Sequence, residues 1–434
     1  MPPLPAVSWF QNATHQAALG WTNRPVPGRD ARLPRKARRT VMRLRPDIRA
    51  TTGHEEGTDT MKEDHALFAI GAADRTASTT LTRALRQWLV APALAMLTAA
   101  GGAPCAAAQE ALATGSSESI KASQLSEGID PEATNFPYPF PVRFFPLTVE
   151  RQSVRMAFMD VAPTLHANGR TVVLLHGKNF SGAYWEPTIR VLAAEGFRIV
   201  VPDQVGFGKS SKPAAFQFSF HILADMTRAL LDSLGIDRFS LVGHSMGGML
   251  ATRFALMFPE RIERLVLVNP IGLEDWKTVV PYRPIDEAYA EELRATPETI
   301  RNYQRARYYG GRWEPEYEKL IALPAGWTRH PEYARVAWCA ALTADMVFTQ
   351  PVVYEFPRIA VPTLLVIGQR DRTAIGSTWA PQDVAARLGD YPTLGRRAAA
   401  AIPGAKLLEI EGVGHLPQVE AFERYRSALL DFIR

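Results

Sequence analysis

The distribution of apolar and polar positions separates an irregular leader from a long patterned region. From about residue 140 onward, short apolar runs alternate with segments in which apolar residues recur every three or four positions. Apolar runs bounded by Gly or Pro predict strands, and the longer periodicity predicts helices. Strands that alternate with helices are typical of a mainly parallel sheet. The predicted strands are residues 154–160, 171–175, 198–202, 239–242, 264–268, 361–367 and 406–410, the first of them antiparallel.

One motif adds chemistry to this pattern. Gly243-His244-Ser245-Met246-Gly247 joins the strand at 239–242 to a predicted helix at 249–258. In this G-x-S-x-G arrangement a sharp turn lifts the serine above the sheet, and bulky neighbours would clash there. The helix that follows directs its N-terminus, which favours developing negative charge, toward the serine. The sequence therefore predicts Ser245 as a nucleophile.

With these residues, the chain resembles the α/β-hydrolase superfamily over about residues 140–434. The other matching segments are His176-Gly177, Asp203 with Gly206-Phe207-Gly208-Lys209-Ser210, Gly368-Gln369-Arg370-Asp371 and Gly412-Val413-Gly414-His415. The resemblance implies an α/β fold with a mainly parallel eight-stranded sheet, helices on both faces and a helical cap after the sixth strand. The core is expected at 137–271 and 357–434, and the cap at 272–356.

A nucleophilic serine needs a base and an acid that orients the base. In this fold the chain order is Ser, Asp or Glu, then His. Asp371 follows the strand at 361–367 and His415 follows the last strand, so both are expected at the same edge of the sheet as Ser245. Glu274 and Asp275, which follow the sixth strand, are the alternative acids.

The developing oxyanion requires two backbone N–H donors. Met246, the residue after the nucleophile, is expected to supply one. Lys178 is expected to supply the other, with Asn179 as the alternative, and this loop lacks the Gly-Gly-Gly of the lipase type. His176 is expected to support the turn after its strand, and Asp203 to hold the Gly-rich turn that follows it.

The region expected to form the cap is rich in large aromatic residues. Eleven of the 63 residues from Trp276 to Trp338 are Trp or Tyr. Most of these rings are expected to pack the cap onto the core, because aromatic side chains bury large apolar areas. Asn179, Trp276 and Tyr282 are the residues expected to line a substrate pocket.

The first 108 residues are predicted to be a leader. Residues 1–60 are expected to be disordered or a mis-assigned N-terminal extension. Residues 61–108 carry Arg83 and Arg86, an uncharged run at 88–100 and Ala106-Ala107-Ala108, which together predict a signal peptide. The run is too short to span a bilayer, so stable membrane insertion is not expected. The protein is therefore expected to be exported, to the periplasm or beyond the cell, with residues 109–136 as a linker.

Charge and cysteine content argue against several other classes of protein. The net charge of +5 arises in residues 1–108, which hold 14 Lys and Arg against eight Asp and Glu, while the other 326 residues hold 35 against 36. The patterned region therefore gives no electrostatic indication of nucleic-acid binding. Two cysteines exclude a disulfide scaffold and a Cys-rich metal site. Neither a metal nor an organic cofactor is expected, because the reaction of a serine, histidine and aspartate needs none.

These observations predict a serine hydrolase that cleaves a carboxylic ester or a related acyl compound, with a small molecule as substrate. Two other reactions stay open within the same fold: carbon–carbon hydrolysis of ring-cleavage products and proline iminopeptidase activity. A non-enzymatic receptor that retains the three residues is the alternative from a different class. The sequence does not indicate an oligomeric state.

Overall fold

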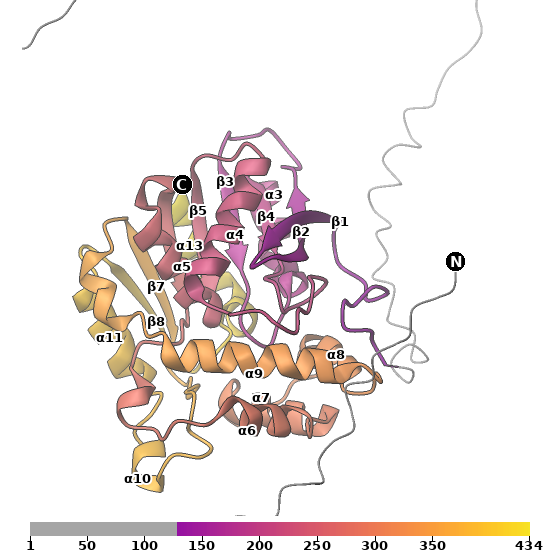
Figure 1. Cartoon of the computed structure of the whole chain (residues 1–434). Coiled ribbons are helices and arrows are strands. Elements are labelled where there is room, and N and C mark those ends of the chain that lie inside the picture. The colour runs from indigo at the N-terminus through magenta and orange to yellow at the C-terminus, as the bar shows by residue number, and fades with distance from the viewer. Residues whose placement is uncertain (1–127) are drawn as a thin grey trace, which may run out of the picture. The chain divides into compact units, whose positions relative to one another are not determined.

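A computed structural model describes residues 128–434, and the predictions for residues 1–127 lie outside this range. Eight strands form one sheet in the order β1-β2-β4-β3-β5-β6-β7-β8 (Figure 1). They are β1 Val142–Val149, β2 Gln152–Val161, β3 Thr171–Leu175, β4 Arg198–Pro202, β5 Phe239–His244, β6 Ile262–Val268, β7 Thr363–Gly368 and β8 Lys406–Ile410. β2 is antiparallel to both of its neighbours, and all other pairs are parallel. The predicted fold class is confirmed.

Helices cover both faces of this sheet because the central strands are apolar on both sides. Val172 and Leu174 of β3 belong to one buried cluster, while Val173 and Leu175 belong to the other. Successive side chains of a strand point to opposite faces, so each cluster lies on its own side of the sheet. The flanking helices are α3 Glu186–Ala194 and α13 Phe422–Ile433 on the first side, and α4 Phe220–Ser233, α5 Met246–Met257 and α11 Tyr391–Ala401 on the second. Shorter elements are η1 Gly182–Trp185, η2 Pro259–Arg261, α10 Gln382–Ala385 and α12 Pro417–Glu420.

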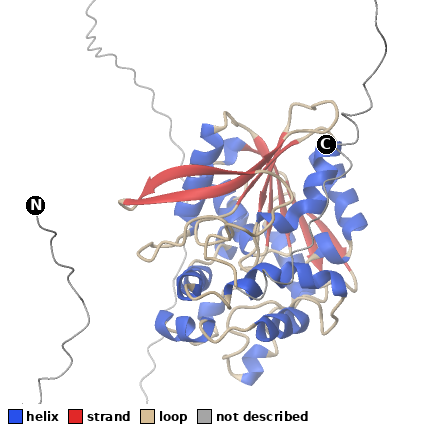
Figure 2. Cartoon of the chain, turned by 90° about the vertical axis from the view of Figure 1, so that its right-hand side faces the viewer, coloured by secondary structure: helices blue, strands red, loops and turns tan. Residues whose placement is uncertain are grey.

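β1 was not predicted, and it forms a long hairpin with β2 (Figure 2). Glu150 and Arg151 make the two-residue turn, with φ values of 50° and 63°. Such tight hairpin turns require positive φ and usually carry Asn or Gly, so this turn has no sequence signal. The Glu150 carboxylate accepts a hydrogen bond from the Gln217 N–H (2.9 Å), which ties the tip of the hairpin to another loop.

Four helices between β6 and β7 form the cap. They are α6 Ile285–Glu292, α7 Pro297–Arg307, α8 Glu318–Trp327 and α9 Tyr333–Thr349, with the short helices η3 Trp276–Thr278, η4 Pro315–Tyr317 and η5 Val353–Arg358 around them. α7 begins at a capping box, in which Thr296 and Thr299 bond reciprocally. Figure 1 shows α6, α7, α8 and α9 gathered at one end of the sheet.

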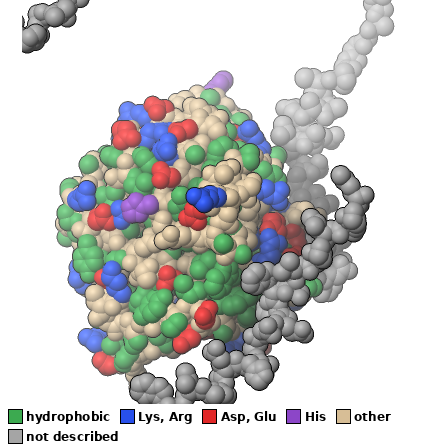
Figure 3. All heavy atoms as spheres, in the orientation of Figure 1, with side chains coloured by type: hydrophobic (Ala, Val, Ile, Leu, Met, Phe, Trp, Pro, Cys, Tyr) green, Lys and Arg blue, Asp and Glu red, His purple; other side chains and the backbone are tan. Residues whose placement is uncertain are grey.

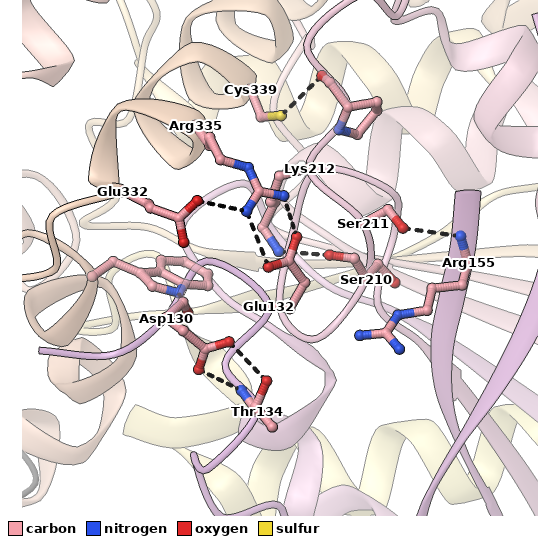
Figure 4. A network of polar contacts seen from close by, with 12 residues as sticks. Asp130, Glu132, Thr134, Arg155, Ser210, Ser211, Lys212, Glu332, Arg335 and Cys339 are labelled. Atoms are coloured by element: carbon pink, nitrogen blue, oxygen red, sulfur yellow. Dashed lines mark hydrogen bonds and ion pairs between the residues drawn. The ribbon is translucent and has the colours of Figure 1, made fainter. Parts of the chain in front are cut away.

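Residues 129–138, which we call the strap, join the cap to the core, although residues up to 136 were expected to be a linker. On the cap side, the Ile129 N–H donates to the Gly326 carbonyl (3.0 Å), and the Trp327 indole donates to the Asp130 carbonyl (3.0 Å). Glu132 forms an ion pair with Arg335 of α9 at 2.6 Å (Figure 4).

On the core side, two strap residues contact the Gly-rich turn after β4. The Lys209 ammonium donates to the carbonyl of Ala133 (2.6 Å), and the Tyr138 hydroxyl donates to Asp203 (2.6 Å). Because Ala133 is fully buried, this part of the strap belongs to the folded domain rather than to a solvated linker.

Candidate active site

Ser245 lies in a strained turn between β5 and α5. Its φ and ψ are 57° and −122°, a region that residues with a side chain rarely occupy. Gly243 and Gly247 make the turn possible. A Cβ on Gly243 would lie 2.2 Å from the Gly247 carbonyl oxygen, and one on Gly247 would lie 2.3 Å from the Leu175 carbonyl oxygen. Backbone strain of this kind is often found at functional sites.

His415 and Asp371 form a fully buried pair in the loops after β8 and β7. The His415 Nδ1 and the Asp371 Oδ2 are 2.6 Å apart, and neither side chain is exposed to solvent. The carboxylate holds the proton on Nδ1, which leaves Nε2 as the basic nitrogen. Among the described residues Nε2 has no hydrogen-bond partner, so no bond joins it to the Ser245 hydroxyl. A hydrogen bond between a catalytic serine and its histidine often shortens to normal length only when substrate binds.

Asp371 is held by two further donors. Its Oδ1 accepts from the Thr373 N–H (2.8 Å), and its Oδ2 also accepts from the Asn269 side-chain amide (2.8 Å). Asn269 directly follows β6 and bonds in turn to the Gly368 N–H through its own oxygen (2.7 Å). We did not predict this residue. The only signal was an amide at the carboxyl end of a buried strand.

The two alternative acids are occupied elsewhere. Glu274 accepts from the Gly389 N–H (2.9 Å) and from the Trp276 indole (3.1 Å), and burial raises the pKa of its carboxyl group. Asp275 accepts from the Tyr354 hydroxyl (2.9 Å) and from the Lys277 N–H. The structure therefore brings Asp371, and neither of these carboxylates, to His415.

His244, next to Ser245, supports the His415 loop. A carbonyl oxygen only accepts, so the His244 Nε2 must donate to the His415 carbonyl (2.9 Å), and its Nδ1 then accepts from the Tyr184 hydroxyl (2.9 Å). Burial holds the pKa of the His244 imidazole well below its ordinary value, so the ring is neutral. The ring centroids of His244 and His415 are 4.8 Å apart, which places the loop that carries His415 beside the serine turn.

His176 has the supporting role expected of it. Its Nε2 accepts from the Gln204 N–H (3.0 Å), and its Nδ1 lies 2.9 Å from the Gly177 carbonyl. Asp203 accepts from the N–H groups of Gly182 (2.6 Å) and Lys209 (2.8 Å), and so pins the Gly-rich turn.

The loop after β3, residues 176–180, approaches the serine turn closely. A Cβ on Gly177 would lie 3.0 Å from the Cβ of Ser245, so Lys178 immediately follows the point of contact. On the other side of the serine, Met246 is the first residue of α5, and the first N–H groups of a helix have no intrahelical acceptor. The two residues expected to supply backbone donors, Lys178 and Met246, thus directly follow Gly177 and Ser245, and these two residues lie against each other.

A cavity of about 450 Å³ lies between the cap and the core. Most of its wall is apolar, as in ordinary small-molecule sites. The core contributes Lys178, Asn179, Phe207 and residues 374–379, and the cap contributes the inward faces of its helices. Two cations of the wall are already paired with carboxylates: Lys178 with Glu292 (3.2 Å) and Arg283 with Glu291.

Two of the three predicted pocket residues line this cavity. Asn179 and Tyr282 do so, and the Tyr282 hydroxyl donates to Asp345 (3.0 Å). Trp276 does not line the cavity. It is 3% exposed and belongs to the main hydrophobic core, and its indole N–H donates to Glu274.

Two further features of residues 128–434 are the arrangement of their metal-ligating side chains and the apolar character of their helices. No group of three or more His, Cys, Asp and Glu in that range is arranged to hold a metal ion. Over the same range, no helix combines the length and apolar character that a bilayer span requires. On the face seen in Figure 3, Lys and Arg side chains lie among Asp and Glu rather than in one patch.

Comparisons with known proteins agree with this architecture. Residues 170–422 match the family described as the alpha/beta hydrolase fold. A solved structure of a probable hydrolytic enzyme from Pseudomonas aeruginosa PAO1 is 51% identical, with a TM-score of 0.70. That alignment covers 71% of this chain and 99% of the other.

Two other relatives are named for different reactions. A 2-hydroxy-6-oxononadienedioate/2-hydroxy-6-oxononatrienedioate hydrolase from Paraburkholderia phymatum is 28% identical over 62% of this chain and 88% of its own length. The structure of a thermophilic esterase from Thermogutta terrifontis is 25% identical, with a TM-score of 0.50, over 67% of this chain and 98% of its own. The chain therefore belongs to the α/β-hydrolase fold family and is a hydrolase.

Proposed function

We propose that the protein is a serine hydrolase that cleaves a carboxylic ester or a related acyl compound of small size. The observation that supports this best is the buried His415–Asp371 pair (2.6 Å) beside the strained turn at Ser245. In this proposal Ser245 attacks the carbonyl carbon, His415 accepts its proton through Nε2, and Asp371 fixes the imidazole tautomer. The backbone N–H groups of Lys178 and Met246 stabilise the oxyanion.

The second half of the reaction uses the same groups. The His415 imidazolium passes its proton to the departing alcohol, and an acyl group stays bound to the Ser245 oxygen. Water, deprotonated by His415, then attacks the acyl carbon, the bond to the Ser245 oxygen breaks to release the acid, and the His415 imidazolium returns its proton to that oxygen. Each proton transfer passes through the His415 Nε2, and none of these steps requires a cofactor.

Carbon–carbon hydrolysis is the second candidate, and the similarity to the Paraburkholderia phymatum enzyme favours it. The name of that enzyme describes a dianionic substrate. In this chain two of the three cations of the cavity wall, Lys178 and Arg283, are already paired with carboxylates, and only Arg294 is left among the described lining residues to meet an anionic group, which disfavours a dianionic substrate. We therefore place the ester reaction first.

The decisive experiment combines a covalent probe with a substrate panel. A fluorophosphonate should label the wild-type protein and leave Ser245→Ala unlabelled, because the probe reacts with an activated serine. Ser245→Ala should also lower turnover of p-nitrophenyl esters by on the order of 10⁶. Faster turnover of a dienoate than of any ester would favour the carbon–carbon reaction, and a labelled protein without turnover would favour a receptor.

A further inference from the structure

The residue after α7, Tyr308, makes close contact with the loop that carries Gly414 and His415. The His415 N–H donates to the Tyr308 carbonyl (2.8 Å), and the Tyr308 ring stacks on the His415 imidazole at 4.4 Å between centroids, with 29° between the planes. A Cβ on Gly414 would lie 1.8 Å from the Tyr308 carbonyl oxygen, so only glycine fits beneath this backbone. Tyr308 is therefore packed directly against the proposed base.

The same side chain also reaches the β3 loop. The Asn179 amide donates to the Tyr308 hydroxyl at 2.7 Å. The preceding residue, Lys178, forms its ion pair with Glu292 of α6. Two consecutive residues of the loop that is expected to supply an oxyanion donor are therefore held by side chains of the cap, and Gly177, which precedes them, abuts Ser245.

The Tyr308 hydroxyl is suited to a fixed structural bond. Tyr308 is 3% exposed, and burial holds the pKa of its phenol well above the ordinary value. The hydroxyl is therefore neutral throughout the physiological pH range. A buried neutral hydrogen bond of this kind keeps its geometry because its groups have no competing water.

We propose that Tyr308 is a positioning residue, which sets the β3 loop and the His415 imidazole relative to each other. The proposal rests on the proposed function, because it assigns a role beside the same serine, histidine and backbone donors. The Tyr308 hydroxyl acts through Asn179 on the loop that carries Lys178. The cap is thus part of the arrangement that stabilises the oxyanion, besides forming the cavity roof.

A double-mutant cycle tests this. Tyr308→Phe should lower kcat for a short p-nitrophenyl ester about fivefold, the effect of losing one hydrogen bond, with KM changed less than twofold. Asn179→Ala should cause a similar loss, and the double variant should lose no more than either single variant. Tyr309→Phe is the matched control. Its hydroxyl is buried without a partner among the described residues and its ring stacks on Tyr317 at 3.9 Å, so kcat should not change.

A second measurement does not depend on turnover. Amide hydrogen exchange in residues 177–180 should be several-fold faster in Tyr308→Phe and Asn179→Ala than in the wild-type protein, and unchanged in Tyr309→Phe. Additive losses of kcat, a raised KM at constant kcat, or unchanged exchange would each overturn the proposal. If the wild-type protein neither hydrolyses esters nor takes the fluorophosphonate, the proposed function fails, and the exchange comparison still decides whether Tyr308 positions the loop.

Discussion

Both oxygens of the Asp371 carboxylate accept hydrogen bonds, so this position suits a carboxylate better than an amide. Oδ1 faces the Thr373 N–H, while Oδ2 faces the Asn269 amide and the His415 Nδ1. An asparagine would direct its NH₂ group at a donor in either orientation. Asp371→Asn should therefore disturb the imidazole tautomer and lower kcat by on the order of 10⁴, measured with a p-nitrophenyl ester.

Two isosteric variants serve as controls for this experiment. Glu274→Gln and Asp275→Asn should each change kcat by less than about threefold, because their carboxylates bond away from His415. If one of them proves crippling while Asp371→Asn is mild, the acid lies after β6 and the assignment of Asp371 is wrong.

Lys212 is a buried cation whose environment makes stability depend on pH. Its ammonium donates to the carbonyls of Phe207 (3.3 Å), Gly208 (2.8 Å) and Ser210 (2.7 Å). Figure 4 shows Lys212 within the surrounding network of polar contacts. These bonds favour the charged form, but burial outweighs them and lowers the pKa of Lys212 from 10.5 to about 8. Between these two values the unfolded chain binds more protons, so the free energy of unfolding rises with pH.

The variant Lys212→Met lacks this titration and isolates its effect. Between pH 7.5 and 9.5, the free energy of unfolding of the wild-type protein should gain about 2 kcal/mol relative to that of the variant. Urea unfolding of both proteins at the two pH values measures the change. A difference that stays constant with pH would show that Lys212 titrates normally in the folded state.

At the scale of elements, one face of α9 sets the size of the cavity. Val336, Ala340, Ala344 and Phe348 recur every four residues and line the cavity wall, with the two alanines in the middle. Ala344→Leu should fill part of the cavity and lower kcat/KM for a long-chain acyl ester at least tenfold, with less than a threefold change for the acetyl ester. Initial rates across a series of acyl lengths measure this shift.

An alanine elsewhere on the cap provides the matched control. Ala306 of α7 is exposed and does not line the cavity, so Ala306→Leu should leave the preference for acyl length unchanged. An equal loss for all esters in Ala344→Leu would point to a folding defect instead of a narrower pocket.

The elements buried on both faces of the sheet were the most predictable. The expected strands at 171–175 and 198–202 coincide with β3 and β4, because continuous apolar runs between turn residues leave little choice. The expected strand at 406–410 also coincides with β8, although that edge strand is only partly buried. β1 could not be predicted in this way, since its sequence, Val-Arg-Phe-Phe-Pro-Leu-Thr-Val, shows no alternation of apolar and polar residues, although exposed and half-buried positions alternate from Phe144 to Val149 in the structure. The turn at Glu150-Arg151 could not be predicted either, because it lacks the Asn or Gly that is typical of tight hairpin turns.

The residues of the site also differ in how well the sequence predicted them. Ser245, Asp371 and His415 each follow a predictable strand, so the topology alone gathers them at one edge. Asn269 and Tyr308 were missed because their partners lie 102 and 129 residues away in the chain. Contacts at such separations depend on how the cap and the loops pack, which single-sequence patterns do not encode.

At the scale of the whole molecule, the strap defines how far the N-terminus can be shortened. A chain that begins at Gln109 keeps the strap and should be soluble and active, because the leader is expected to serve only export. A chain that begins at Pro141 loses the bonds of Asp130, Ala133 and Tyr138 to the cap and core, and should melt several degrees lower with reduced turnover.

Thermal unfolding and ester turnover of the two shortened chains measure this directly. Equal melting temperatures would show that the strap contributes nothing to stability. Loss of folding in the chain that begins at Gln109 would show that residues 1–108 belong to the domain, and would contradict the proposal that they form an export leader.

The hairpin at the edge of the sheet also affects how molecules of this protein meet one another. β1 and β8 are the two edge strands, where unpaired backbone groups can recruit a strand from a second chain and start aggregation. Pro146 lies in β1 and has no N–H to offer, and Arg143 adds a charge to the same strand. β8 is only five residues long and begins with a lysine. Neither edge therefore presents the long, uninterrupted row of donors and acceptors from which a cross-β assembly grows.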